Sequence, residues 1–194
     1  MGVGRMDDRE VAMLVARVQE GDAPSFQPIV REFTPPLYNL ARKMLSGSED
    51  AADAVQEAFY RAYRDIAKFD GRTRFFSWLY GICVNVCYDA GKRRKRHMER
   101  ETPLDEGEAA QPEGGESALE RLESRQIQEA LRSCLQKIPA PQRAALLLRY
   151  QEDLSVDEVA QVLDIGLSAA KMRISRGLAA LQAVCRDSGM GGTP

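Results

Sequence analysis

Cationic side chains near the C-terminus are the residues best suited to act on another molecule. Lys171, Arg173 and Arg176 lie within two turns of a predicted helix, and Ile174 and Leu178 supply its inward face. Long cationic side chains near the start of such a helix can reach phosphates and guanine edges in a DNA major groove. The alternative is an ordinary basic face in contact with solvent, and the preceding elements favour the DNA-reading role.

A second group combines aromatic and cationic side chains. Phe69, Arg72 and Arg74 lie in or beside a predicted turn at residues 70–71. This combination suits single-stranded nucleic acid, because unpaired bases stack on aromatic rings while cations follow the phosphates. Trp78 follows at helical spacing and is expected in the core rather than at a base.

Residues for catalysis or metal binding are scarce. His97 is the single histidine, so a Ser-His-Asp triad or a multi-histidine metal site lacks its residues. Cys83 and Cys87 share a helix face and could ligate a metal with His97, but free cysteine is more often a small buried hydrophobe. We therefore expect no enzymatic activity, no metal and no cofactor.

The cellular location is predicted from what the chain lacks. Its four cysteines do not have the dense spacing of a disulfide scaffold, and its N-terminus has no apolar signal core. No apolar run approaches the roughly 20 residues that a spanning helix needs. We expect a cytoplasmic protein with no membrane insertion of its own.

The elements that must position these residues are helices, since apolar residues recur at helical spacing and strand alternation of useful length is absent. Helices in the first half are predicted from a cap at Asp7 or Asp8 to Gly21, through 26–44, after Ser48, and at about 73–93. Pro35 and Pro36 are expected to break or kink the second of these helices.

The second half contains a predicted helix-turn-helix. Capping boxes at Ser117 and Ser155 open two of its helices, and a tight connection at 164–167 follows the second. Ser168 is then expected to cap the helix that holds the cationic group. A short helix, a tight turn and a second helix form the layout in which the second helix reads DNA.

The net charge hides a segregated distribution. The chain has 27 basic and 29 acidic residues, a balance that argues against nucleic-acid binding when read as one number. Residues 92–100, however, hold six bases and one acid, whereas residues 101–118 hold six acids and no base. The acidic stretch has too little apolar surface to offset its ordering entropy, so it is predicted to be a flexible linker.

These features together resemble the bacterial extracytoplasmic-function (ECF) sigma factors, the two-domain class of RNA polymerase specificity subunits. Residues 37–96 resemble region 2 of that family, and residues 138–182 resemble its region 4. The resemblance implies an all-α fold with a region 2 bundle at 7–98 and a region 4 helix-turn-helix domain at 118–187. A flexible acidic linker at 99–117 would join these two small helical domains.

The resemblance also implies roles for three groups of side chains. Those that match the face docking on the polymerase clamp helices are Asp53, Gln56 and Glu57. Those that match minus-10 contacts are Phe69, Arg72, Arg74, Phe75, Asn85, Arg93 and Arg94. Those that match minus-35 contacts are Ser168, Lys171, Met172, Arg173, Ser175 and Arg176.

The partners implied by the resemblance are core RNA polymerase, bound through its clamp helices and flap, and promoter DNA. The DNA would be bound as a minus-35 duplex and a minus-10 single strand, and an anti-sigma factor is a further expected partner.

Asp164 stands where the family usually has a turn glycine, and aspartate tolerates the left-handed conformation. Two other functions remain open, a stand-alone helix-turn-helix regulator and a metal- or thiol-dependent enzyme.

Overall fold

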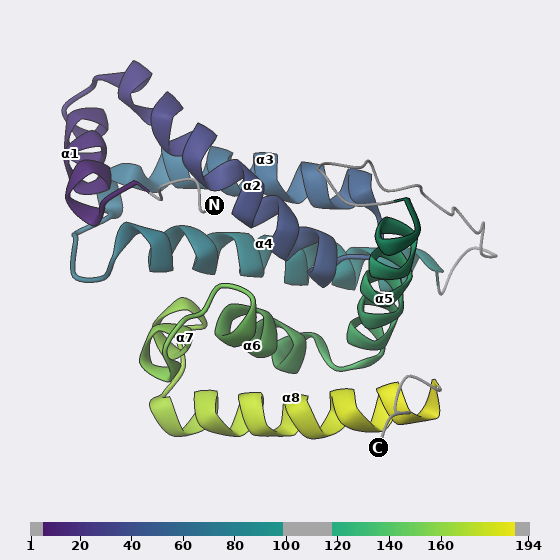
Figure 1. The fold of residues 1–194 in the computed structure, drawn as a ribbon. Helices are drawn as coiled ribbons and strands as arrows, with labels where there is room; N and C mark the ends of the chain where they lie inside the picture. Colours follow the sequence, from purple (N-terminus) through teal and green to yellow (C-terminus); the bar gives the residue numbers. More distant parts are fainter. Residues whose placement is uncertain (1–5, 99–117, 189–194) are drawn as a thin grey trace.

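The computed structural model describes residues 6–98 and 118–188, so the predicted linker lies outside the described residues. Within them the fold is all-α, as predicted (Figure 1). The N-terminal domain consists of α1 (Asp8–Gln19), α2 (Phe26–Met44), α3 (Ser48–Asp65) and α4 (Phe75–Met98), with short 3-10 helices at Ala23–Ser25 and Ile66–Lys68. The C-terminal domain consists of α5 (Ala118–Lys137), α6 (Ala140–Tyr150), α7 (Val156–Val162) and α8 (Leu167–Asp187).

Local capping explains several predicted helix boundaries. The Asp7 side chain accepts a hydrogen bond from the Arg9 backbone at the start of α1, which is the predicted cap. Ser155 and Glu158 form the predicted capping box of α7. Asp164 has a φ of 49°, so it adopts the left-handed conformation expected of this turn.

One predicted cap is wrong. Gly166, not Ser168, occupies the N-cap position of α8. Gly166 is extended, with a ψ of 151°, and the helical conformation begins directly after it at Leu167. Ser168 therefore falls inside the first turn of α8, where it is exposed.

Of the break or kink predicted at Pro35 and Pro36, the break is wrong, because α2 runs continuously through both prolines. A proline costs a helix interior about 3 kcal/mol, mainly through a lost hydrogen bond and a clash with the preceding turn. The inward face of α2 offsets that cost, since Phe33, Leu37 and Leu40 are all buried in the core.

The two domains pack against each other in layers. In Figure 1, α6 and α7 lie between α4 and α8, and α5 lies beside the C-terminal end of α2. The buried apolar side chains form one continuous core that crosses from the N-terminal domain into the C-terminal domain. Over residues 6–98 and 118–188, none of the helices combines the length and apolar character of a membrane span.

Candidate nucleic-acid and protein interfaces

The outer face of α3 carries the predicted polymerase-docking residues. Asp53 and Gln56 are exposed and Glu57 is half-buried, whereas Ala54 and Val55 between them turn inward to the core. With α4 they line a groove of about 560 Å³. Glu57 is held by an ion pair with Arg61 at 2.6 Å, and Arg61 also lies 3.7 Å from Asp89 of α4. The groove is thus polar and acidic along its α3 side.

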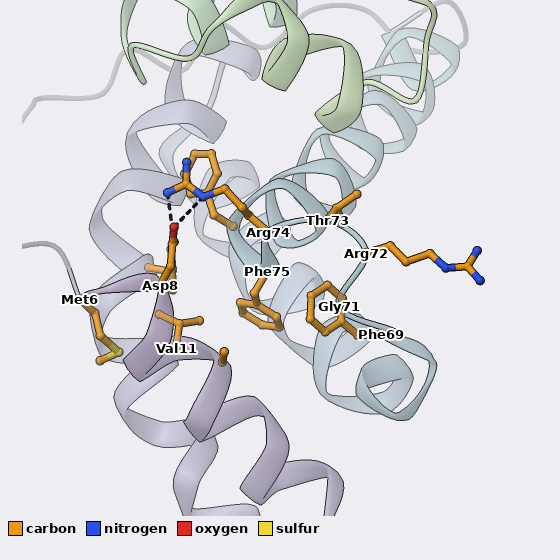
Figure 2. Close-up of a pocket in the computed structure, with 12 residues that line it drawn as sticks. Met6, Asp8, Val11, Phe69, Gly71, Arg72, Thr73, Arg74 and Phe75 are labelled. Carbon is orange, nitrogen blue, oxygen red and sulfur yellow. Dashed lines mark hydrogen bonds and ion pairs between the residues drawn. The ribbon is translucent and has the colours of Figure 1, made fainter.

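A tight turn shapes the loop that precedes α4. Gly71 has a φ of 72°, a conformation that favours glycine. The Asp70 side chain accepts a hydrogen bond from the Arg72 backbone at 3.0 Å and pairs with the Arg72 guanidinium at 3.1 Å. Figure 2 shows Arg72 pointing away from the adjoining cavity, which has a volume of about 330 Å³.

Three aromatic rings, those of Phe69, Phe75 and Trp78, form a cluster at the base of this loop. The Phe69 ring centroid lies 5.4 Å from that of Phe75 and 5.3 Å from that of Trp78. Phe75 is only 6% exposed and Trp78 packs against the core, as the sequence predicts for Trp78. Phe69 comes directly from the loop and is half-buried, so part of its surface remains accessible.

Arg74 is held by two carboxylates from different domains. Its guanidinium lies 2.9 Å from Asp8 Oδ2 at the start of α1 and 2.7 Å from Glu158 Oε1 in α7. Figure 2 shows the contact with Asp8 at the edge of the cavity. The hydrogen bond with Asp8, followed by the contacts with Glu158, raises the pKa of Arg74. The guanidinium also lies 5.9 Å from the centre of the Phe76 ring.

The remaining region 2 residues lie on the solvent side of α4. Asn85, Arg93 and Arg94 are exposed, and Arg94 pairs with Asp50 of α3 at 2.7 Å. The helix extends to Met98, about five residues beyond the predicted end, so the basic run at 92–96 lies on a helix. All five side chains of that run are exposed, so the C-terminal end of α4 is strongly basic.

The predicted reading helix is α8, which packs on α6 through its buried face. Ala170, Ile174 and Gly177 form that face, and a Cβ at Gly177 would lie 2.9 Å from Leu146 Cγ. At about 100° per residue, the exposed predicted contacts fall within an arc of about 140°. The residues in this arc are Ser168, Lys171, Met172, Ser175 and Arg176. Arg173 lies outside the arc and is half-buried, and it lines a cavity of about 280 Å³ together with Met172 and Arg176.

Comparison with known proteins agrees with this geometry. The family model of sigma-70 region 2 matches residues 29–97, and that of sigma-70 region 4 matches residues 128–181. The ECF RNA polymerase sigma factor SigW of Bacillus subtilis (strain 168) is 30% identical over 178 residues, covering 89% of this chain and 95% of SigW. The chain belongs to the ECF sigma factors. The ECF RNA polymerase sigma-E factor of Escherichia coli (strain K12) is 32% identical over 178 residues, covering 87% of this sigma factor and 91% of the relative.

Solved structures share the fold of this sigma factor. CnrH, solved in complex with the cytosolic domain of CnrY, aligns with a TM-score of 0.67 and 24% identity over 93% of this chain and 99% of CnrH. The sigma factor RpoE, solved with the anti-sigma factor NepR from Bartonella quintana, aligns with a TM-score of 0.65 and 23% identity. That alignment covers 83% of this chain and 96% of RpoE.

Tyr60 is a further candidate docking residue of this sigma factor, outside the group predicted from the sequence. Tyr60 is 62% exposed and lines the groove beside Glu57, one helical turn further along α3. The spacing from Asp53 through Glu57 to Tyr60 is the signal that could have identified it, since residues three and four apart share a helix face.

Burial is predicted for Cys83 and Cys87, and the structure confirms it. Cys83, Cys87 and Cys134 are buried, and Cys185 is half-buried. A hydrogen bond with Cys87, together with burial, raises the pKa of the Cys83 thiol well above its usual range. Among the residues that the structure describes, no three or more His, Cys, Asp or Glu side chains gather as a metal site would require.

Proposed function

We propose that this alternative sigma factor directs RNA polymerase to promoters by reading a minus-35 duplex with α8 and holding a melted minus-10 strand beside α4. The observation that carries the proposal is the arc of exposed side chains on α8. It combines the cations Lys171 and Arg176 with Ser168, Met172 and Ser175 on the second helix of a helix-turn-helix. Such a helix fits a major groove, where arginine can bind guanine edges in bidentate geometry.

The minus-10 strand would be bound by the loop before α4. Phe69 offers a partly accessible side chain from the aromatic cluster, and the Arg72 guanidinium points into solvent beside it. Stacking of a base on such a ring contributes about 1–3 kcal/mol, and a cation beside the ring attracts the phosphates. Further along α4, Lys92 and Arg96 of the basic run are exposed on the same helix face as Asn85.

Core RNA polymerase would dock on the groove of α3, formed by Asp53, Gln56 and Glu57 with Tyr60 at its edge. Binding of both domains to polymerase and DNA would be reinforced because each domain raises the effective concentration of the other.

RpoE, a structural neighbour, was solved with an anti-sigma factor, and we extend a partner of that class to this chain. A stand-alone regulator is not favoured, because region 2 matches in addition to region 4.

The test is run-off transcription on genomic fragments with core polymerase and the full chain. Arg176→Ala should lower initiation about tenfold, since a lost base contact costs about 1–3 kcal/mol. Asn85→Ala should also lower initiation while leaving the binding of polymerase unchanged, because Asn85 is exposed and does not line the groove between α3 and α4.

Arg186→Ala is the matched control for Arg176→Ala. Arg186 is exposed on the same helix, more than two turns beyond the reading arc, so its loss should leave initiation unchanged. The proposal fails if the wild-type chain has no affinity for core polymerase, or if Arg176→Ala and Asn85→Ala initiate at the same promoters as efficiently as wild type.

A further inference from the structure

One side chain of α1 holds the segment that leads into the loop before α4. Gln19 is the last residue of α1, and its Nε2 amide donates to the Ile66 carbonyl and to the Phe69 carbonyl at 2.8 Å each. A primary amide has two N–H groups, so both donors of Gln19 are used. The Ile66 carbonyl also accepts from the Phe69 backbone at 3.0 Å. Gln19 thus links α1 to both Phe69 and the start of the 3-10 helix before it.

These hydrogen bonds act where the backbone leaves the helical conformation. Phe69 is extended, with a φ of −72° and a ψ of 112°, and the next helix begins at Phe75. A carbonyl in such a segment has no partner of the kind that a helix supplies, so a side chain takes that place. The Asp70 side chain does the same for the Arg72 backbone N–H. The conformation of the loop is therefore set by side chains, with Gln19 acting at Phe69.

The direction of the Phe69 ring depends on the same contact. The ring packs against Phe75 at an interplanar angle of 89° and lies 5.3 Å from the Trp78 ring. Both of those rings belong to α4, whereas the Phe69 carbonyl is held by α1. Because ring and carbonyl belong to one residue, α1 and α4 together fix Phe69. Loss of the Gln19 amide would leave it held by the α4 rings.

The other end of the loop is also in contact with α1. Asp8, in the first turn of α1, pairs with Arg74 at 2.9 Å, and the eleven positions from Asp8 to Gln19 span about 16 Å of helix. Figure 2 shows Asp8 on the opposite side of the cavity from Phe69. Arg74 is held by Glu158 as well, so its position does not depend on α1 alone. Gln19 is therefore the contact whose removal affects Phe69 most directly.

We propose that Gln19 is a positioning residue for the minus-10 strand, which holds Phe69 in the conformation that receives an unpaired base and does not itself touch the DNA. The inference rests on the proposed function, in which a base stacks on Phe69. A loop that adopts its binding conformation for only a fraction of the time binds with an affinity lowered by that fraction. Gln19 raises the fraction by fixing the loop before the strand arrives.

Two substitutions remove the contact in different ways. Gln19→Ala removes the amide, whereas Gln19→Glu keeps its size but places a carboxylate, which only accepts hydrogen bonds, against two carbonyl oxygens. Both variants should fold, because Gln19 is exposed and the buried face of α1 is unchanged. Gln27→Ala is the matched control, since it truncates an exposed glutamine in the first turn of α2 of the same domain.

Trp78 is the single tryptophan and reports on the loop in the free protein. Its ring lies 5.3 Å from that of Phe69, so loosening of Phe69 should make it more accessible to acrylamide. We expect the quenching constant of Trp78 fluorescence to rise in Gln19→Ala and Gln19→Glu and to keep its wild-type value in Gln27→Ala. Equal quenching in all four proteins would overturn the inference, because Gln19 would then not hold Phe69.

Run-off transcription with core polymerase measures the consequence for the minus-10 strand. On a genomic fragment at which the wild type initiates, Gln19→Ala should lower initiation about fivefold, the ratio that corresponds to the loss of one net hydrogen bond. Binding of core polymerase should be unchanged, because Gln19 does not line the groove between α3 and α4. Wild-type initiation by Gln19→Ala, or an equal loss of polymerase binding, would contradict the positioning role.

A double-mutant cycle with Phe69→Ala separates positioning from other effects. If Gln19 acts through Phe69, Gln19→Ala should lower initiation no further when Phe69 is already alanine. A direct contact of Gln19 with DNA, or a general weakening of the N-terminal domain, would give the same loss in both backgrounds. That additive result would overturn the inference.

Failure of the proposed function has a different signature. Phe69→Ala would then initiate as efficiently as the wild type, or the wild type would initiate at no promoter, and the minus-10 role of Gln19 would fail with it. The quenching of Trp78 would still show whether Gln19 holds Phe69 in place.

Discussion

Single residues in this sigma factor combine a local role with a role between domains, and Glu158 is the clearest case. One carboxylate oxygen accepts hydrogen bonds from the backbone and hydroxyl groups of Ser155 in the capping box of α7. The other accepts from Arg74 in the N-terminal domain at 2.7 Å. The Ser155 backbone hydrogen bond is the largest cause of the lowered pKa of Glu158, and Arg74 contributes in the same direction.

Substitution of Glu158 separates these roles. Glutamine can preserve the capping box but cannot form the ion pair, so Glu158→Gln should lower the free energy of unfolding by no more than about 1 kcal/mol at pH 7. Because the pKa of Glu158 is lowered in the folded state, the contribution of its charge is fully present above the ordinary value of 4.5 and is lost as the pH falls below it.

Urea denaturation of both proteins at pH 7 and at pH 4 or below measures the effect. The difference in unfolding free energy between wild type and Glu158→Gln should shrink toward zero at the lower pH. A difference that stays constant or grows on acidification would contradict the assignment of the effect to the Glu158 charge.

At the level of the elements, local chemistry was sufficient to predict several helix boundaries, although not the start of α8, where Gly166 rather than Ser168 is the N-cap. The Asp7 cap, the capping box at Ser155 and the left-handed Asp164 all follow from side-chain chemistry within a few residues. The continuity of α2 through Pro35 and Pro36 could not be predicted in this way, because burial of distant core residues outweighs the local cost. Among the predicted minus-35 residues, Arg173 lies outside the arc on α8 and is half-buried beside Gln142, a placement that spacing along α8 does not indicate.

Replacement of glycine by alanine should lower the stability of the chain at Gly177 of α8 but not at Gly91 of α4, because only Gly177 is closely packed, against α6. Gly177→Ala places a Cβ 2.9 Å from Leu146 Cγ and 3.1 Å from the Gln142 carbonyl oxygen. Overpacking of this kind costs about 1–3 kcal/mol, more than the gain of up to about 1 kcal/mol in helix propensity. Gly177→Ala should therefore lower the melting temperature of the chain.

The Gly91→Ala variant supplies the comparison for that measurement. Gly91 is exposed and surrounded by open space, so only the gain in helix propensity remains and the melting temperature should stay level or rise. Thermal unfolding followed by circular dichroism checks both signs. A stabilising effect of Gly177→Ala would contradict the close packing described for α6 and α8.

For the whole molecule, the sequence predicts two helical domains but not their contact. Arg143 looks like an ordinary basic residue in an amphipathic helix, yet it is 7% exposed and donates to Met44, Gln136 and Ile138. Burial lowers the pKa of Arg143, although hydrogen bonds satisfy much of its guanidinium. Nothing in the local pattern around Arg143 indicates that the Met44 carbonyl, 99 residues earlier in the chain, is one of its partners.

Because the buried apolar side chains of both domains form one core, we expect the two domains to unfold together. Trp78 is the single tryptophan and reports on the N-terminal domain, whereas circular dichroism reports on the helices of both domains. In urea the two signals of the wild type should change at the same midpoint, as expected for one cooperative unit. Gln136→Ala removes both hydrogen bonds to the end of α2, at a cost of about 1 kcal/mol each, and should separate the two midpoints.

The control for this measurement is Gln128→Ala, which truncates the same residue type two turns earlier in α5 at an exposed position. Its fluorescence and circular dichroism midpoints should coincide as in the wild type, because Gln128 makes no hydrogen bond to α2 in the described part of the chain. If the midpoints of Gln136→Ala also coincide, the end of α2 is not what couples the domains. Wild-type midpoints that already differ would mean that the continuous core is too weakly coupled across the interface to act as one unit, even though its buried side chains are contiguous.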